Sequence, residues 1–198
     1  MTVSIFSVKE QLTFYGAYHN NPTNVLIHKC CVPLLLWSFQ VLMVTCPVPA
    51  FFPPIHVNIN EYLAFDLNWA TIHAILYIVY YFILEPTAAL IYIPQMTLSL
   101  LAATSFALRS NGVPMAVCMN VGAWIAQFIG HYGPEGRAPA LLDNIVGALV
   151  LAPFFVHLEI LFSLGYKPEL RKNIHNGVGQ EILRVKKAEA AKKRGKEL

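Results

Sequence analysis

Charged side chains are scarce in this sequence, because only 13% of its 198 residues are Asp, Glu, Lys or Arg. Soluble domains carry about 25% charged residues. Hydrophobic residues make up 56% of the chain, and the mean hydropathy is +0.52. This composition argues against a soluble domain and predicts a helical membrane protein. The N-terminal residues lack the basic-then-apolar layout of a signal peptide, so we expect the first apolar segment to remain in the mature protein.

Motifs of several enzyme classes are also missing. The sequence has no HxxHH boxes, and its seven histidines are too few for the membrane di-iron hydroxylases that use such boxes. It has no GxSxG elbow and no Walker loop, which argues against the enzyme classes built on these motifs. The four cysteines form no CxxC pair and lie in or beside apolar runs, so we interpret them as buried apolar residues.

Proline and asparagine mark the start of the first long apolar segment. A helix should begin at Asn21-Pro22, because Asn is a preferred N-cap and Pro suits the first helical position. This helix should continue to about Thr45, which makes it long enough to cross a bilayer. Residues 7–19 before it could form an amphipathic helix on the membrane. Four prolines in residues 46–61 indicate an irregular connection after it.

Residues 62–108 form one nearly unbroken apolar tract. Glu85-Pro86 divides this tract into two segments of about 23 residues, each long enough to cross with some tilt, and we expect them to form a helical hairpin. Residues 113–131 predict a fourth span, in which Gly122 and Gly130 allow close helix packing. No internal repeat and no strand alternation is visible.

A fifth apolar segment, residues 145–165, either crosses the membrane or is re-entrant, and its proline and ionisable pair favour the second interpretation. Ten of the 14 Lys and Arg residues lie at or after Lys167, so the positive-inside bias places this end in the cytosol. We therefore predict an all-α polytopic membrane protein with four spans and this fifth segment. It should comprise a single helical membrane domain over residues 1–172 and a basic polar tail, outside the core, over residues 173–198.

Two polar islands interrupt the apolar sequence, one at residues 15–33 before the first span and one at residues 127–144 after the fourth. Four crossings are an even number, so both islands should lie on the same side of the membrane. His19 and His28 lie at the start of the first span and His131 at the end of the fourth, so their depths match. Neutral imidazole suits iron, copper and zinc. We predict that these three histidines share one metal, the alternative being three separate packing residues.

Each of the other polar residues in the islands has two interpretations. Glu135 and Asp143 could supply a fourth ligand or orient the histidines. For Asp143, helix capping or a salt bridge to Arg137 is the structural alternative. Asn24 and Asn144 could orient a ligand or bind substrate, or they could cap helices.

The histidines outside the islands have a simpler interpretation. His73 and His157 lie within apolar segments, where we expect them to be hydrogen-bonded packing residues. His175 lies in the polar tail and should be solvated.

The motifs of the two islands resemble those of a known family. YHxNPxNVLIH at 18–28, WxxQFxGHxxxEGRxPALLDN at 124–144 and LAPFF at 151–155 are similar to the fungal Mpo-type 2-hydroxy-fatty-acid dioxygenases of the endoplasmic reticulum membrane. The resemblance covers about residues 11–172. It implies an Fe(II)-dependent, multi-pass enzyme that shortens 2-hydroxy fatty acids by one carbon, a step of phytosphingosine breakdown in yeast.

The resemblance also implies roles for particular residues. His19, His28 and His131 fall on the family's histidines, and Glu135 and Asp143 fall on its acidic positions. We accordingly expect the three histidines to bind iron. We expect catalytic contributions from Glu135, Asp143 and Arg137, and substrate binding by Tyr18, Asn24, Arg137 and Asn144.

The chemistry of such a substrate fits these residues. A 2-hydroxy acid can chelate one metal through a carboxylate oxygen and the adjacent hydroxyl. Arg137 could pair with the substrate carboxylate, or instead with a lipid phosphate or Asp143. Its reaction with O2 gives the shorter acid, CO2 and water, and balances without flavin, haem or 2-oxoglutarate. The apolar spans could hold the acyl chain, at roughly 0.8 kcal/mol for each buried CH2.

Two other functions remain open from the sequence. One is a non-enzymatic membrane lipid-binding or scaffold protein with structural histidines, and the other is a zinc-dependent lipid hydrolase. Nucleic acid is not an expected partner, because the basic residues lie in a tail beside a membrane, where anionic lipid is nearer.

Overall fold

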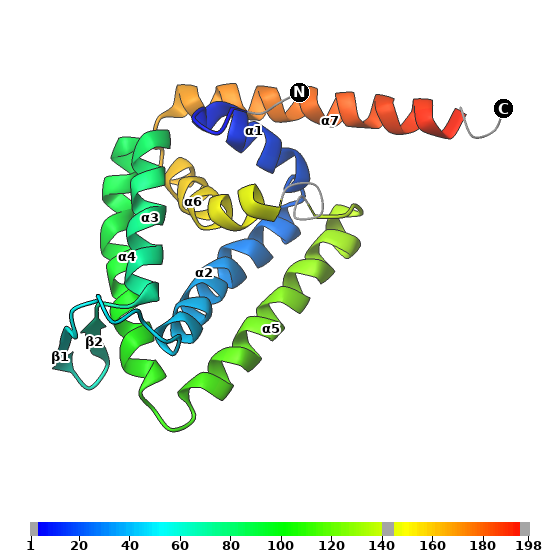
Figure 1. Cartoon of the computed structure of the whole chain (residues 1–198). Coiled ribbons are helices and arrows are strands. Elements are labelled where there is room, and N and C mark those ends of the chain that lie inside the picture. Colours follow the sequence, from blue (N-terminus) through cyan, green and yellow to red (C-terminus); the bar gives the residue numbers. More distant parts are fainter. Residues whose placement is uncertain (1–3, 140–144, 195–198) are drawn as a thin grey trace.

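Four helices run alternately up and down and form the body of the computed structural model, which describes residues 4–139 and 145–194 (Figure 1). They are α2 (Pro22–Val44), α3 (Trp69–Leu84), α4 (Pro86–Ala107) and α5 (Gly112–Gly130). α3 packs beside α4, and α2 packs beside both α4 and α5. Because the direction alternates, the start of α2 and the end of α5 meet at one end of the molecule, as the predicted parity of the spans requires.

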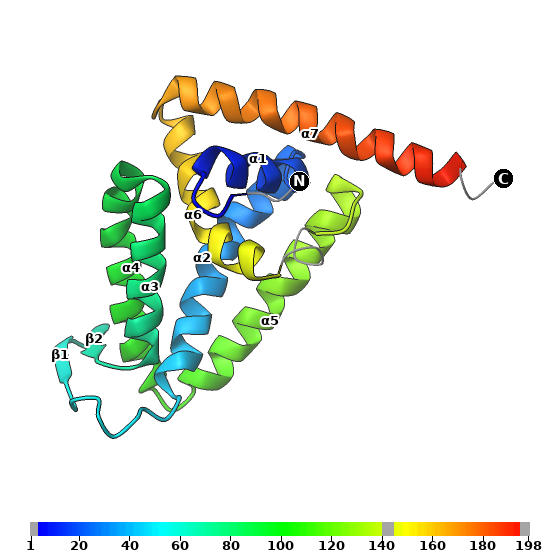
Figure 2. The same cartoon turned by 45° about the horizontal axis from the view of Figure 1, so that its top comes forward.

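Three more helices cover this end of the bundle (Figures 1 and 2). They are α1 (Val8–Tyr18), α6 (Ile145–Ser163) and α7 (Pro168–Arg194). A short π-helical turn, η1 (His131–Glu135), extends α5. At the opposite end, β1 (His56–Asn60) and β2 (Leu63–Asp66) lie in the connection between α2 and α3. The predicted all-helical fold is confirmed, apart from this small hairpin.

The predicted start of the first long helix is confirmed. The Asn21 side chain accepts a hydrogen bond of 2.9 Å from the backbone N–H of Thr23, and Pro22 occupies the first helical position. The same device starts α3, where the Asn68 side chain accepts from the backbone N–H of Thr71 at 3.2 Å. These caps satisfy N–H groups that a helix leaves without partners at its first turn.

The β-hairpin corrects the expectation that the sequence forms no strands. His56 lies opposite Asp66 in an antiparallel pair. The Asn60 side chain accepts hydrogen bonds of 2.9 Å from the backbone N–H groups of Tyr62 and Leu63, which fixes the turn. β1 reads His-Val-Asn-Ile-Asn, so polar and apolar residues do alternate in it, but over only five residues, and every one of them is exposed.

The span prediction holds for three helices. α2, α4 and α5 extended by η1 are long and apolar enough to cross a membrane. α3 has only 16 residues, or about 24 Å of helix against the roughly 30 Å of a bilayer core. The expected segment of about 23 residues is therefore wrong here, because residues 63–66 form β2. α3 nevertheless returns the chain to the α1 end of the bundle.

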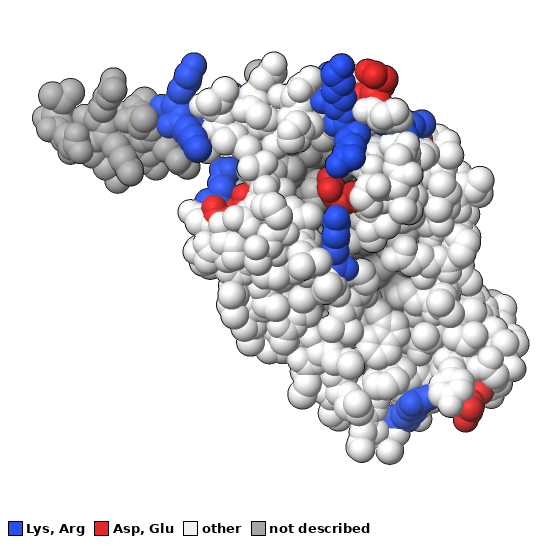
Figure 3. All heavy atoms as spheres, turned by 180° about the vertical axis from the view of Figure 1, so that it is seen from behind, with Lys and Arg blue, Asp and Glu red and all other residues white. Residues whose placement is uncertain are grey.

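The outward faces of the helices are apolar. On α5 a stripe at four-residue spacing is 43–61% exposed, and it consists of Val117, Val121, Ile125 and Ile129. On the face shown in Figure 3, charged residues gather toward the two ends and leave a band without charge between them. Exposed apolar surface of this extent indicates contact with lipid. The cysteines were expected to be buried, but Cys31 is half-buried and the other three are exposed.

α6 begins and ends in the half of the molecule that holds α1 and α7 (Figures 1 and 2). Its exit is joined to the turn between α3 and α4, where Glu85 accepts hydrogen bonds from Tyr166 at 3.0 Å and Lys167 at 2.9 Å. Phe154 and Leu158 of α6 are fully buried in the core. This arrangement agrees with the re-entrant interpretation of the fifth segment.

α7 packs along α1, contrary to the expectation that the basic tail stays outside the core. Ile174 and Val178 are buried in the main hydrophobic cluster. The contact is close because a Cβ at Gly16 would lie 2.7 Å from a methyl group of Val178, and one at Gly177 would lie 2.8 Å from the hydroxyl of Thr13. The expected boundary between residues 172 and 173 therefore falls inside α7.

We predict that Gly177→Val lowers stability by forcing α7 away from α1. Overpacking of this kind costs about 1–3 kcal/mol, which corresponds to a fall of several degrees in the melting temperature. The matched control is Gly179→Val on the same helix, where a Cβ would meet nothing within 4 Å. Thermal unfolding in detergent compares the two variants, and equal melting temperatures would contradict the predicted close contact.

Candidate metal centre

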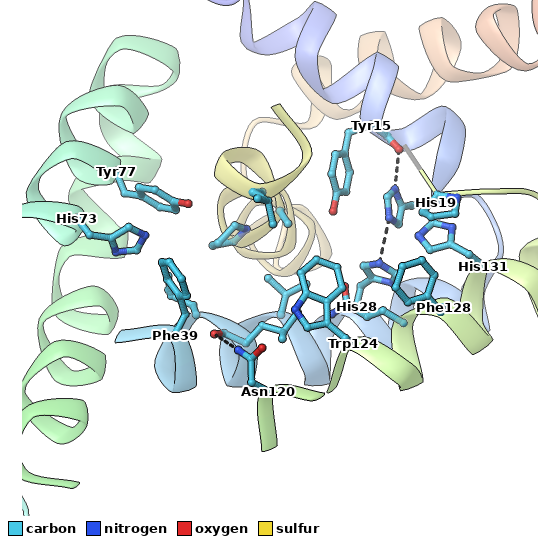
Figure 4. Close-up of a pocket in the computed structure, with 18 of the residues that line it drawn as sticks. Tyr15, His19, His28, Phe39, His73, Tyr77, Asn120, Trp124, Phe128 and His131 are labelled. Atoms are coloured by element: carbon cyan, nitrogen blue, oxygen red, sulfur yellow. Dashed lines mark hydrogen bonds between the residues drawn. The ribbon is translucent and has the colours of Figure 1, made fainter. Parts of the chain in front are cut away.

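Three histidines from two distant parts of the chain meet at the end of the bundle that α1 covers (Figure 4). His19 follows α1, His28 lies in the second turn of α2, and His131 directly follows α5. One ring nitrogen of each lies within 4.8 Å of the others. The three residues are at most 6% exposed. The structure thus has the convergence expected from the parity of the spans.

The rings of His19 and His28 are oriented by the backbone. Nδ1 of His19 donates to the carbonyl of Tyr15 at 2.8 Å, and Nδ1 of His28 donates to the carbonyl of Asn24 at 2.9 Å. A carbonyl can only accept, so both Nδ1 atoms carry the proton and both Nε2 atoms carry a lone pair.

These two Nε2 atoms face each other at 3.2 Å. Two lone pairs at that distance repel unless a cation lies between them. Burial first, and then the nearby His28, hold the pKa of His19 well below its usual value, so a shared proton is disfavoured. The spacing suits neighbouring ligands of one ion with bonds of about 2.0–2.1 Å. Metal-binding histidines characteristically donate their other ring N–H to a carbonyl in this way.

His131 completes the group. Its ring centroid lies 4.8 Å from that of His19 and 5.0 Å from that of His28. Its Nδ1 atom is buried and has no hydrogen-bond partner among residues 4–139 and 145–194. Buried polar atoms without partners are rare and call for an explanation. Three neutral imidazoles form a donor set that fits iron, copper or zinc.

Glu135 faces the start of α2. Its carboxylate accepts hydrogen bonds from the backbone N–H groups of Asn20 at 3.1 Å and Asn21 at 2.9 Å, and from the Asn24 side chain at 3.1 Å. The π-helical turn and the left-handed Gly136 (φ 69°) reverse the chain so that the carboxylate reaches this position. Of the two expected functions, this geometry supports orientation of the histidines over a fourth ligand.

Asn24 is enclosed between α2 and α5. It is fully buried, and its side chain lies so close to α5 that a Cβ at Gly130 would be 2.4 Å from its Oδ1 atom. The expected packing role of Gly130 is thus borne out, whereas a Cβ at Gly122 would meet nothing within 4 Å. Asn24 does not line the cavity described below, so the geometry gives it a structural position beside His28.

Arg137 and Tyr18 lie against the end of α1. Arg137 donates a hydrogen bond of 2.9 Å to the carbonyl of Ala17, and its guanidinium lies 4.2 Å from the ring centroid of Tyr18. Neither residue lines the cavity. They stabilise the turn that carries His19, and the expected pairing of Arg137 with substrate has no counterpart here. Asp143 and Asn144 lie outside the described residues.

The histidine group opens into an apolar cavity of about 490 Å³ (Figure 4). Its walls come from α2, α3, α5 and α6. The three histidines lie at one end, and His73 and Tyr77 of α3 lie at the other. Ligand sites of roughly 300–1,000 Å³ hold small organic molecules, so this volume suits a lipid chain.

Tyr15 is a cavity residue that was not predicted as part of the site. Its ring stacks on His19 with centroids 4.1 Å apart and an angle of 4°. Its hydroxyl has no hydrogen bond to another described residue, and burial raises its pKa, so it remains a donor. The available signal was the spacing of four residues to His19, which places both on one helix face.

His73 corrects the expectation of a hydrogen-bonded packing residue. Both of its ring nitrogens are buried, and neither has a hydrogen-bond partner in the part of the chain that the structure describes. Its ring instead contacts those of Tyr77 at 4.1 Å and Phe39 at 5.5 Å between centroids. By contrast, His157 is the hydrogen-bonded packing residue that we expected, because its Nε2 atom donates to the carbonyl of Ala88 at 3.1 Å.

We predict that Glu135→Ala lowers the free energy of unfolding by about 1–3 kcal/mol, because it removes the charged acceptor of the hydrogen bonds from Asn20, Asn21 and the buried Asn24 at the start of α2. Glu159→Ala removes a half-buried glutamate from α6 for which no hydrogen bond is found among the described residues, and it should change the value by less than about 0.5 kcal/mol. Denaturant unfolding in detergent compares them. Equal losses would contradict the capping role of Glu135.

Comparison with known proteins agrees with the geometry. Residues 5–164 match the family described as 2-hydroxy-palmitic acid dioxygenase Mpo1-like. The chain is 32% identical over 195 residues to the 2-hydroxy-palmitic acid dioxygenase MPO1 of Saccharomyces cerevisiae, and the alignment covers 94% of this chain and 99% of that protein. No solved structure matches it. The cavity, the histidine group and the sequence therefore lead to one conclusion: this chain belongs to the Mpo1-like family of 2-hydroxy-palmitic acid dioxygenases.

Proposed function

We propose that this chain is an Fe(II)-dependent dioxygenase that shortens 2-hydroxy fatty acids by one carbon, with His19, His28 and His131 as the iron ligands. Membership of the family supports the reaction. The observation that carries the metal assignment is the pair of Nε2 lone pairs that face each other at 3.2 Å beside the buried His131. Three neutral nitrogen ligands suit ferrous iron, and the proposal assigns that metal rather than zinc.

The proposed reaction balances with O2 as the only co-substrate. The bond between C1 and C2 of the 2-hydroxy acid breaks, and C1 leaves as CO2. C2 is oxidised to the carboxyl carbon of the shorter acid, and the remaining oxygen atom leaves as water. Bound iron would supply O2 activation and a Lewis acid for the hydroxy acid.

Tyr15 is the residue that we propose to position the polar end of the substrate. Its hydroxyl belongs to the cavity lining next to His19 and remains protonated, so it can donate a hydrogen bond to the carboxylate or the 2-hydroxyl group. Arg137 and Glu135 act indirectly in this proposal. Arg137 holds the end of α1 through the carbonyl of Ala17, and Glu135 holds the start of α2.

The acyl chain is proposed to occupy the apolar cavity along α2. Val32 and Leu36 line its floor, and Trp124 and Phe128 of α5 line one wall. Each CH2 that leaves water contributes roughly 0.8 kcal/mol. The substrate would enter from the membrane, where such an acid is dissolved.

We further propose a multi-pass location in the endoplasmic reticulum membrane, with the site and α7 on the cytosolic side. The basic α7 lies at the same end of the bundle as the histidines (Figure 1), and cytosolic ends of membrane proteins are enriched in Lys and Arg. This placement would suit the degradation of 2-hydroxy acids released from sphingolipids such as phytosphingosine.

We predict that His19→Ala, His28→Ala and His131→Ala each remove bound iron and abolish O2 consumption with 2-hydroxypalmitate. The control is His175→Ala, an exposed histidine of α7 that should retain both. Metal analysis and an oxygen electrode give the two readouts. Stoichiometric zinc with no O2 consumption would favour a hydrolase, and the absence of any metal would favour a lipid-binding scaffold.

A second prediction concerns Tyr15→Phe. Loss of one hydrogen bond to a charged group costs about 1.5–3 kcal/mol, so kcat/KM for 2-hydroxypalmitate should fall roughly ten- to hundredfold. Bound iron should stay at the wild-type level, because Tyr15 contacts iron only through His19 in this proposal. Tyr132→Phe is the control, since Tyr132 is 60% exposed. An unchanged kcat/KM would remove Tyr15 from the substrate site.

A further inference from the structure

We infer that Phe39, His73 and Tyr77 close the far end of the acyl cavity and set the longest fatty acid that it accepts. The inference rests on the proposed function, because it assigns the length limit of the same substrate. These three residues would then determine specificity for chain length, and they are separate from the histidine group.

The three rings form the end of the cavity opposite the histidine group (Figure 4). His73 and Tyr77 are four residues apart on α3 and therefore project from one face of the helix. Their rings are in contact at 4.1 Å, and Phe39 reaches His73 from α2 at 5.5 Å. α2 and α3 thus contribute to one aromatic wall.

The distance between the aromatic wall and the histidine group suits a long acyl chain. The cavity follows α2 from His28 past Val32 and Leu36 to the helical turn that holds Phe39 and Leu42. Phe39 lies eleven positions after His28, which corresponds to about 16.5 Å at the helical rise of 1.5 Å per residue. A fatty acid with its polar end at the histidines would therefore bring its terminal methyl group to the aromatic wall.

His73 contributes to this wall by its shape alone. Both ring nitrogens are covered and lack hydrogen-bond partners, so the imidazole gains nothing from hydrogen bonding in the described structure. Removing it would leave no partner group unsatisfied, and truncation mainly enlarges the cavity. His73→Ala therefore tests length selection without the loss of a hydrogen bond.

The test uses purified protein and a series of saturated 2-hydroxy fatty acids of increasing length, with kcat/KM measured from O2 consumption. His73→Ala and Phe39→Ala should move the optimum to longer acids by the number of CH2 groups that the new space holds. Each additional buried CH2 should raise kcat/KM for the longer acids by about fourfold, the factor that corresponds to its transfer from water. His73→Trp should move the optimum to shorter acids.

Leu76→Ala and Val79→Ala are the matched controls on α3. Both residues point away from the cavity and are 61% and 54% exposed, so both variants should keep the wild-type length profile. Bound iron and the melting temperature are measured for every variant to exclude a folding defect. If His73→Ala fails to fold, Phe39→Ala and Tyr77→Ala test the same wall from two different helices.

The outcomes separate this inference from the proposed function. Unchanged length profiles in the folded wall variants would overturn the inference, even if the wild-type protein consumes every acid of the series. Failure of the iron-loaded wild-type protein to consume any 2-hydroxy acid would overturn the proposed function itself. A shift toward longer acids in the alanine variants and toward shorter acids in His73→Trp, with unchanged controls, would support the inference that the aromatic wall sets the length limit.

Discussion

The hydrogen bonds from His19 and His28 to backbone carbonyls are the interactions on which the site depends. Each ring donates through Nδ1 to the carbonyl four residues earlier, so each Nε2 atom is left with a lone pair that points into the same small space. Because these bonds are made within α1 and α2, the direction of each ring is fixed once the two helices are docked. The rest of the fold serves to dock those helices and to bring His131 beside them.

Three contacts perform that docking, and all three are made by residues 130–137 at the end of α5 and directly after it. Glu135 binds the backbone at the start of α2, Arg137 binds the end of α1, and Gly130 lets α5 approach Asn24 closely. Behind α1 lies α7, whose contact at Gly177 leaves no room for a larger side chain. The basic C-terminal helix therefore supports the position of His19 from outside the cavity, a structural role beyond its charge.

Much of the fold and the convergence of the three histidines could be predicted from local sequence rules and the number of crossings. Asn21-Pro22 is an unambiguous helix start, and an even number of crossings brings His28 and His131 to the same end. The hairpin was missed, because the alternation in β1 covers only five residues and β1 is exposed throughout, so it buries no apolar face. The burial of Ile174 and the unpartnered rings of His73 depend on contacts with helices far away in the sequence. Local patterns do not contain that information.

We propose that one iron ion binds three imidazoles contributed by the ends of three helices, at one end of an apolar acyl cavity. X-ray absorption spectroscopy on the purified protein loaded anaerobically with Fe(II) tests this claim most directly. We predict one iron per chain, with scattering from three imidazole rings in the wild-type protein. Iron that binds without imidazole scattering, or a spectrum that is the same in the His131→Ala variant, would contradict it.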